Sequence, residues 1–345
     1  MNAKRHTQHD RNRHSCKQMI KAILESIAVG DAMGMPTEFM TRESIESKFG
    51  QVNHLIDPGY SLIHSDLKYA QITDDTEQNV YLIKEYCAKG SIEVENTAVS
   101  LLNWIRETGA IEKKYIGPSS LKALKAIEAG EDPHKAGQNG TTCGGIMRTP
   151  AAVLCTREGD RQSLIRNVQN CCIPTHNTST ALEAAMAYAF AMEACLQRSS
   201  IEEVIEKAVE GAAEGIKRAP YKMCAASSGE RIRYLWENRK CFDSGQKLLD
   251  FLFNVFGTGM ESEDVCAAVF GIFMFAGEDV WLAIRLGASL GGDTDTVAAL
   301  AAALCCAYAG RHNIPDEILE TVLKENNLDF EEVSDTIVKV WRQEQ

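Results

Sequence analysis

Two short acidic clusters contain the side chains of this sequence that are best suited to chemistry. The segment 72–78 reads ITDDTEQ, and the segment 291–296, more than two hundred residues later, reads GGDTDT. Each pairs two aspartates with two threonines, and an apolar stretch that favours a helix follows it. Hard divalent cations such as Mg²⁺ and Mn²⁺ prefer such oxygen ligands. If the fold brings the clusters together, four carboxylates will repel one another unless cations neutralise them.

Each cluster also has a purely structural interpretation. A threonine or aspartate ahead of a helix caps its first N–H groups, and acidic residues in the first turn interact favourably with the helix dipole. One carboxylate is enough for that purpose. Two pairs at distant positions, each at a helix start, therefore favour a two-metal hydrolytic centre.

The segment 30–39, GDAMGMPTEF, is the third candidate for a functional site. Its small residues allow a close approach of the backbone, and Pro36 stiffens the turn. Glu38 then lies on a loop, where functional side chains are frequent. The alternative is that Gly30 ends a helix and that Glu38 is a solvated surface acid.

Together these motifs resemble the ADP-ribosylglycohydrolase family, which includes the enzyme that removes ADP-ribose from dinitrogenase reductase. The segments 145–150 (GIMRTP) and 175–176 (TH) fit the same pattern, and the order and spacing of the motifs match over roughly residues 17–310. The resemblance implies an all-α fold, a compact single-domain orthogonal helical bundle with a dinuclear metal site that holds two Mg²⁺ or Mn²⁺ ions.

The resemblance also implies roles for individual residues. The metal ligands would be Thr73, Asp74, Asp75, Asp293, Asp295 and Thr296. Glu38 matches a family glutamate beside the metals, so the candidates for catalysis are Glu38, Asp74, Asp75 and Asp295. The residues expected near the ribose and phosphates are Gly144, Gly145, Met147, Arg148 and His176. Arg148 suits a diphosphate because of its forked guanidinium, although it could equally pair with a helix-face acid.

One segment departs from the family pattern. Many members have Asn-Gly-Ala-x-Met-Arg where this chain has CGGIMR at 143–148. The thiol of Cys143 cannot replace the donors and the acceptor of an amide. In addition, no Asp or Glu stands between Asp132 and Glu158, so this loop offers no carboxylate to a guanidinium. Both observations weaken the case for an ADP-ribosyl-arginine substrate.

Helical periodicity dominates the remaining chain, and strand patterns are almost absent. The expected helices are 17–29, 42–48, 74–88, 93–107, 121–129, 146–155, 162–170, 178–196, 201–218, 230–238, 246–256, 262–275, 280–290, 294–308, 316–325 and 330–342. No linker divides the chain. We therefore expect a flexible polar tail at 1–15 and one ADP-ribosylglycohydrolase-like all-α domain at 16–345.

The composition of the chain limits the kinds of partner that it could bind. The net charge of −12 over 345 residues argues against a nucleic-acid-binding surface or an anionic-membrane anchor. No apolar run approaches the roughly 20 residues that cross a bilayer. Many of the twelve cysteines lie in apolar helical segments, which is typical of reduced thiols in a cytoplasmic protein.

The expected activity is a Mg²⁺- or Mn²⁺-dependent glycosidase that hydrolyses the ribosyl bond of ADP-ribosylated protein side chains or of a related ADP-ribosyl compound. Such cleavage needs a water nucleophile and passes through an oxocarbenium-like transition state, and paired metals can anchor the ribose and acidify the water. Two alternatives remain: a hydrolase of a small free N-glycoside or nucleoside, and a non-catalytic structural relative.

Overall fold

The computed structural model describes the backbone of residues 2–342 and the side chains of residues 15–342. Its long and medium helices are α1 (Asn2–Gly34), α2 (Arg42–Phe49), α3 (Asp74–Lys89), α4 (Val94–Thr108), α5 (Pro118–Glu128), α9 (Arg161–Cys172), α10 (Ser179–Leu196), α11 (Ile201–Arg218), α12 (Ser228–Asn238), α14 (Ser262–Ala276), α15 (Val280–Ala288), α16 (Thr294–Ala309), α17 (Asp316–Glu325) and α18 (Phe330–Trp341). Shorter helices are η1 (Met35–Thr37), η2 (Pro58–Tyr60), α6 (Pro133–Ala136), α7 (Gly144–Met147), α8 (Thr149–Leu154), η3 (Arg239–Cys241), α13 (Gly245–Phe251) and the π-helical η4 (Leu252–Phe256).

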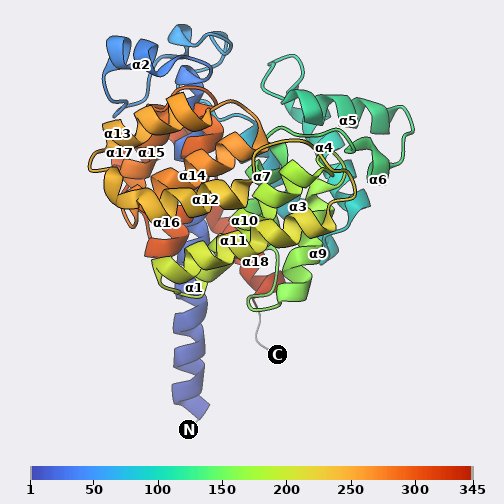
Figure 1. The fold of residues 1–345 in the computed structure, drawn as a ribbon. Coiled ribbons are helices and arrows are strands. Elements are labelled where there is room, and N and C mark those ends of the chain that lie inside the picture. The colour runs from blue at the N-terminus through green and yellow to red at the C-terminus, as the bar shows by residue number, and fades with distance from the viewer. Residues whose placement is uncertain (1, 343–345) are drawn as a thin grey trace.

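This architecture confirms the expected all-α fold. Residues 2–342 contain no β-strand, only two isolated bridges that join Thr142 to Glu261 and Thr178 to Tyr221. The helices pack around the Ala-rich helices α10 and α16, which are buried over most of their length (Figure 1). Burial on nearly every side explains why these two helices lack a polar stripe.

Two glycines set the position of α1 against α16. A Cβ atom on Gly30 would lie 2.6 Å from the carbonyl oxygen of Ala298, and a Cβ on Gly34 would lie 2.4 Å from that of Thr294. Only residues without a side chain allow this approach. The C-terminal part of α1 is therefore held against the first turn of α16, where the second acidic cluster begins.

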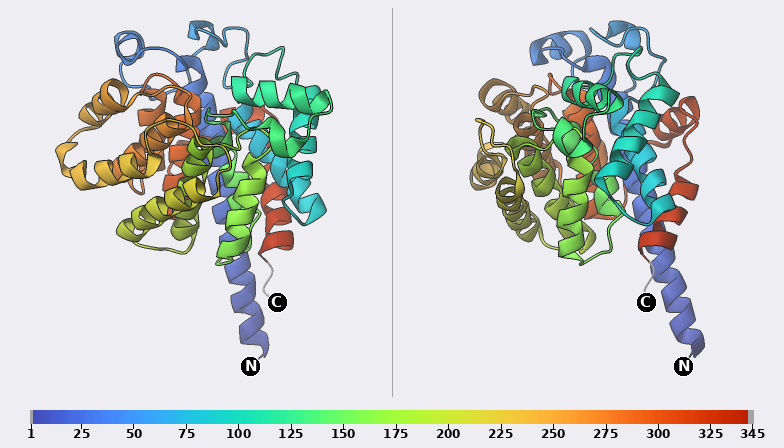
Figure 2. Two further views of the ribbon diagram at one scale, coloured as in Figure 1. Left: turned by 45° about the vertical axis from the view of Figure 1, so that its right-hand side comes forward. Right: turned by 90° about the vertical axis from the view of Figure 1, so that its right-hand side faces the viewer.

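The N-terminal part of α1 projects from the helical body, as two further views also show (Figures 1 and 2). The backbone of residues 2–15 is helical and continuous with the rest of α1, and the flexibility expected for the segment 1–15 stays a prediction. No glycine or proline precedes Gly30, so nothing in the sequence interrupts the helix. The expected end of this helix at Gly30 was too early, because packing on α16 keeps residues up to Gly34 helical.

Most other predicted helices agree with the structure to within a few residues, but two predicted helices are divided. The predicted helix 146–155 is split into α7 and α8 at Arg148. Pro150 causes this break, because it lacks an N–H and its ring clashes with the carbonyl four residues earlier. The predicted helix 246–256 changes from α13 to the π-helical turn η4 at Leu252.

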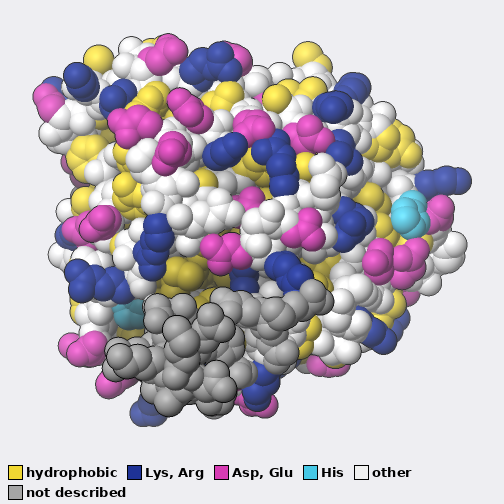
Figure 3. All heavy atoms as spheres, turned by 90° about the horizontal axis from the view of Figure 1, so that it is seen from below, with side chains coloured by type: hydrophobic (Ala, Val, Ile, Leu, Met, Phe, Trp, Pro, Cys, Tyr) yellow, Lys and Arg dark blue, Asp and Glu magenta, His cyan; other side chains and the backbone are white. Residues whose placement is uncertain are grey.

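The surface at the end from which α1 projects carries acidic and basic side chains side by side (Figure 3). The part of this face that the described residues form shows no large patch of one charge. Among the described residues, no helix is both long and apolar enough to span a bilayer.

Candidate metal centre and cleft

The structure brings the two acidic clusters together at the N-terminal ends of α3 and α16. The hydroxyl of Thr296 donates a hydrogen bond of 3.3 Å to Oδ2 of Asp75. A carboxylate oxygen from each of Asp31, Asp75 and Asp295 lies within 4.8 Å of the other two. Residues from α1, α3 and α16, remote in sequence, therefore form one acidic centre.

The purely capping interpretation of the clusters does not describe this arrangement. Thr73 and Asp293 occupy the N-cap positions of α3 and α16, yet neither side chain accepts a hydrogen bond from its own helix. The N–H groups at the start of α3 bond instead to Asp31 of α1, with distances of 2.9 Å from Thr73 and 3.0 Å from Thr76. The start of α3 is thus capped by Asp31 and not by the carboxylates of its own cluster.

Asp31 belongs to the motif 30–39 and to this centre, although no role was predicted for it from the sequence. Its carboxylate also accepts hydrogen bonds from the hydroxyls of Thr73 at 2.7 Å and Thr76 at 2.6 Å. Burial raises the pKa of Asp31 to about 6, although these hydrogen bonds act in the opposite direction. A lone aspartate within the apolar run of 17–35 was the signal that could have identified it.

The electrostatics of the centre suit a cation. Burial is the main cause that raises the pKa of Asp74, Asp75 and Asp295, and neighbouring carboxylates raise each of them further. Burial, with the charge of Glu38, raises the pKa of Asp293 to about 6. Moreover, the buried Oδ1 of Asp75 has no hydrogen-bond partner. An orphaned carboxylate oxygen among oxygen donors fits a hard divalent cation.

A cleft opens above this centre. The residues that line it are Glu38, Phe39, Asp74, Tyr115, Gly117, Pro118, Ser120, Thr142, Cys143, Gly144, Met147, Met260, Asp293, Asp295 and Thr296. The thiol of Cys143 donates to Oδ2 of Asp293 at 3.1 Å, so the residue that departs from the family pattern contacts the acidic centre. Burial is the main cause that raises the pKa of this thiol, and it is therefore neutral.

Part of the predicted substrate-binding set lies beneath the cleft. Gly144 and Met147 line it, whereas Gly145, Arg148 and His176 are buried and do not. Arg148 donates to Oε1 of Gln78 at 3.2 Å and to the hydroxyl of Thr175. Substrate binding by the three buried residues stays a prediction. The contacts that they make support α7 from below the cleft.

His176 is the centre of that support. Its Nδ1 lies 3.2 Å from Nη2 of Arg148, and burial lowers its pKa well below the usual value, with Arg148 adding to the effect. A Cβ atom on Gly144 would lie 2.7 Å from Cε1 of His176. The neutral ring therefore packs directly under the glycine pair that begins α7.

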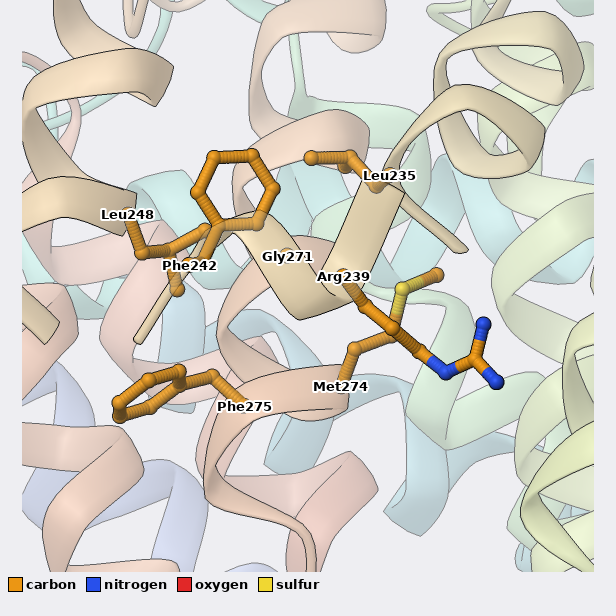
Figure 4. Close-up of a pocket in the computed structure, with 7 residues that line it drawn as sticks. All are labelled: Leu235, Arg239, Phe242, Leu248, Gly271, Met274 and Phe275. Atoms are coloured by element: carbon orange, nitrogen blue, oxygen red, sulfur yellow. The ribbon is translucent and has the colours of Figure 1, made fainter. Parts of the chain in front are cut away.

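Another cavity, of about 210 Å³, lies between α12, α13 and α14 (Figure 4). It is lined by Leu235, Arg239, Phe242, Leu248, Gly271, Met274 and Phe275. The guanidinium of Arg239 extends away from the two phenylalanine rings and stacks on Trp236 at 3.7 Å. This lining offers no acid or nucleophile, in contrast to the acidic cleft.

Comparison with known proteins identifies the family. Residues 13–345 match the family model described as ADP-ribosylglycohydrolase. The chain belongs to the ADP-ribosylglycohydrolase family. The uncharacterized protein YegU of Escherichia coli (strain K12) is 26% identical over 329 residues, which cover 94% of this chain and 98% of that protein.

One further relative and one solved structure have names that indicate an activity. The ADP-ribosylarginine hydrolase Tri1 of Pseudomonas putida (strain GB-1) is 26% identical over 312 residues, which cover 88% of this chain and 73% of that protein. A solved ADP-ribosylglycohydrolase-related protein complex aligns with a TM-score of 0.65 and 23% identity, over 95% of this chain and 99% of that one. At this identity the structural match shows the fold alone. Membership of the ADP-ribosylglycohydrolase family supports a hydrolase that acts on ADP-ribosyl bonds.

Proposed function

We propose that this chain is a divalent-metal-dependent hydrolase that cleaves the ribosyl bond of an ADP-ribosylated protein side chain or of a related ADP-ribosyl compound. The observation that carries the proposal is the meeting of the two acidic clusters beneath one cleft. Two Mg²⁺ or Mn²⁺ ions would be held by Thr73, Asp74, Asp75, Asp293, Asp295 and Thr296, with Asp31 as an added oxygen donor. When bound, such ions supply an anchor for the ribose hydroxyls and lower the pKa of a water.

The residues of the chain account for the proton transfers. The oxygen of a water attacks the anomeric carbon, and the bond from that carbon to the leaving nitrogen or oxygen breaks. Asp74, Asp295 and Glu38 line the cleft, and one of these carboxylates accepts the proton of the water and then passes it to the leaving nitrogen or oxygen. Asp75 is buried, does not line the cleft and accepts a hydrogen bond from Thr296, which does line it.

For the acceptor group of the substrate, ADP-ribosyl-arginine is the first compound to test. The name of the Pseudomonas putida relative, ADP-ribosylarginine hydrolase, supports it. The region 133–157 offers no acid to a guanidinium, but Glu38 and Asp74 line the same cleft and can offer one.

A second candidate is a hydrolase of a small free N-glycoside or nucleoside. One observation favours it: Arg148, expected at the diphosphate, is fully buried and bonded to Gln78 and Thr175. A substrate without a diphosphate would not need this guanidinium. The two candidates share the metal and ribose chemistry and differ only in the outer part of the cleft.

The state of the cysteines indicates the cellular compartment in which the protein works. The structure leaves all twelve cysteines unpaired, and eight of them are buried within helices or at their ends. Unpaired buried thiols support a reducing compartment, so we propose a cytoplasmic enzyme.

The decisive experiment measures ADP-ribose release from ADP-ribosyl-arginine peptides and base release from nucleosides, with Mg²⁺, with Mn²⁺ and with a chelator. We expect turnover of the ADP-ribosyl peptide only with a metal. Binding of simple ribosides but not of ADP-ribose would select the second candidate. Absence of turnover on every substrate, together with no metal uptake by calorimetry, would leave a non-catalytic relative.

Variants of the acidic clusters provide the matching prediction. Asp74→Asn and Asp295→Asn should each lower turnover at least about 100-fold, because each loses a carboxylate that faces the cleft. Asp316→Asn is the matched control, since Asp316 is exposed and begins α17. Full activity of both cluster variants in the same assay would contradict the assigned roles.

A further inference from the structure

We infer that His64 is a positioning residue that holds the carboxylate of Glu38 toward the acidic centre. The inference rests on the proposed function, because it assigns a partner to a candidate catalytic residue of the same site. His64 lies in the irregular segment 50–73 and was not predicted as a site residue.

The geometry of the pair is direct. Nε2 of His64 lies 2.7 Å from Oε2 of Glu38, and the two side chains are only 1% and 13% exposed. A carboxylate only accepts when ionised, so Nε2 carries the proton and donates it. Hydrogen bonds to an ionised acceptor are shorter and stronger than neutral ones, and this distance is of that kind.

Hydrogen bonds fix the backbone at His64 and next to Glu38. The side chain of Glu38 is therefore the part of the pair that has to be oriented. The hydroxyl of Ser61 accepts from the N–H of His64 at 3.0 Å, and the N–H of Leu67 donates to the carbonyl of His64 at 3.0 Å. Next to Glu38, the N–H of Phe39 donates to the carbonyl of Gly292 at 2.8 Å. The backbone of Glu38 is thus tied to the second acidic cluster.

Electrostatics explain why Glu38 needs a donor. Ligand atoms of Glu38, His64 and Asp295 all lie within 4.8 Å of one another. Two carboxylates at this range repel, and a glutamate with solvent on one side could relieve the repulsion by turning away. The Nε2–H of His64 offsets this repulsion and keeps Glu38 in the cleft. Precise orientation of a catalytic group raises the rate of reaction rather than the affinity for substrate.

Three variants separate this role from simple packing. His64→Phe keeps a ring of similar size without the donor, and His64→Gln offers an amide N–H at about the position of Nε2. His54→Gln is the matched control, because His54 is exposed in the same segment and contacts Asn53. Circular dichroism melting would verify that each variant folds.

We expect His64→Phe to lower kcat about 10- to 100-fold, the usual cost of losing an orienting partner, with KM changed less than about threefold. His64→Gln should recover most of the loss, and His54→Gln should equal the wild type. In a Glu38→Gln background, His64→Phe should cause little further loss, since the pair acts as one unit.

Several results would overturn the inference. Unchanged kcat in His64→Phe, or losses that simply multiply with Glu38→Gln, would remove the positioning role. Nitrogen coupling from His64 to bound Mn²⁺ in electron paramagnetic resonance would make it a ligand instead. If the wild type releases no ADP-ribose, the proposed function fails separately. Proton NMR still decides the inference in that case: a protected His64 Nε2–H signal that Glu38→Ala abolishes supports it, and an unchanged signal refutes it.

Discussion

Asp31 links the start of α3 to the acidic centre through one buried carboxylate. It accepts hydrogen bonds from the N–H and hydroxyl groups of both Thr73 and Thr76. In doing so it replaces the local cap that Thr73 would otherwise provide, and the carboxylates of Asp74 and Asp75 are left for other partners. At the scale of single residues, the site therefore depends on a side chain that contributes to both folding and charge.

Replacement of Asp31 tests this dual role. Asp31→Asn puts an amide N–H₂ where two donors now point, so it should lower the free energy of unfolding by about 1–3 kcal/mol. It should also weaken Mn²⁺ binding about tenfold or more. Urea unfolding and isothermal calorimetry would measure the two effects. Asp57→Asn, at an exposed cap of η2, should change neither.

At the scale of elements, the contact between α1 and α16 sets the distance between Asp31 and the second cluster. Gly30 and Gly34 permit that contact, as their missing side chains leave room for the backbone of α16. Gly292, just before α16, also permits a close contact. A Cβ there would lie 1.8 Å from the carbonyl oxygen of Thr258, and the φ of Gly292 is +83°. Small residues thus determine where the aspartates meet.

A methyl group at Gly34 should separate the two helices. We expect Gly34→Ala to cost about 1–3 kcal/mol of stability, the usual range for an overpacked core, and to weaken metal binding because Asp31 moves with α1. Gly117→Ala is the control for stability: its Cβ would meet nothing within 4 Å, and its φ is negative. Equal melting temperatures for both variants would argue against the close contact.

At the scale of the whole molecule, the fold concentrates buried acids in one place, and its stability should depend on protons or cations there. Asp31 and Asp293 have a pKa of about 6 in the folded chain, against about 3.9 in an unfolded one. Between these values the folded state binds more protons than the unfolded state. The stability that these two carboxyl groups add to the folded state is therefore fully present below about pH 4 and is lost as the pH rises through 6.

Cations should replace these protons. The increase in melting temperature caused by Mg²⁺ should thus be larger at pH 7.5 than at pH 5, since metal binding has to displace bound protons at the lower pH. Scanning calorimetry with Mg²⁺ or with a chelator, at several pH values, would measure it. An increase that does not vary with pH would show that the buried aspartates do not bind the ion.

Much of this arrangement is local and could be predicted from the sequence. Periodicity located α11 (Ile201–Arg218) and most other helices, because amphipathic spacing and capping residues act within a few turns. The starts of α3 and α16 coincided with the acidic clusters for the same reason. The break at Pro150 was also a local signal, and the prediction of one helix over 146–155 overlooked it.

The remaining features arise from contacts between segments far apart in sequence. By itself the sequence determined the all-α class, the family motifs and the acidic residues as candidates for metal binding. Only the tertiary structure decided that Asp31 caps α3, that His64 reaches Glu38 and that Arg148 is buried beneath the cleft. Side-chain chemistry and helical period are properties of neighbouring residues. The meeting of α1, α3 and α16 is instead set by close packing of the whole core, and no short stretch of sequence specifies it.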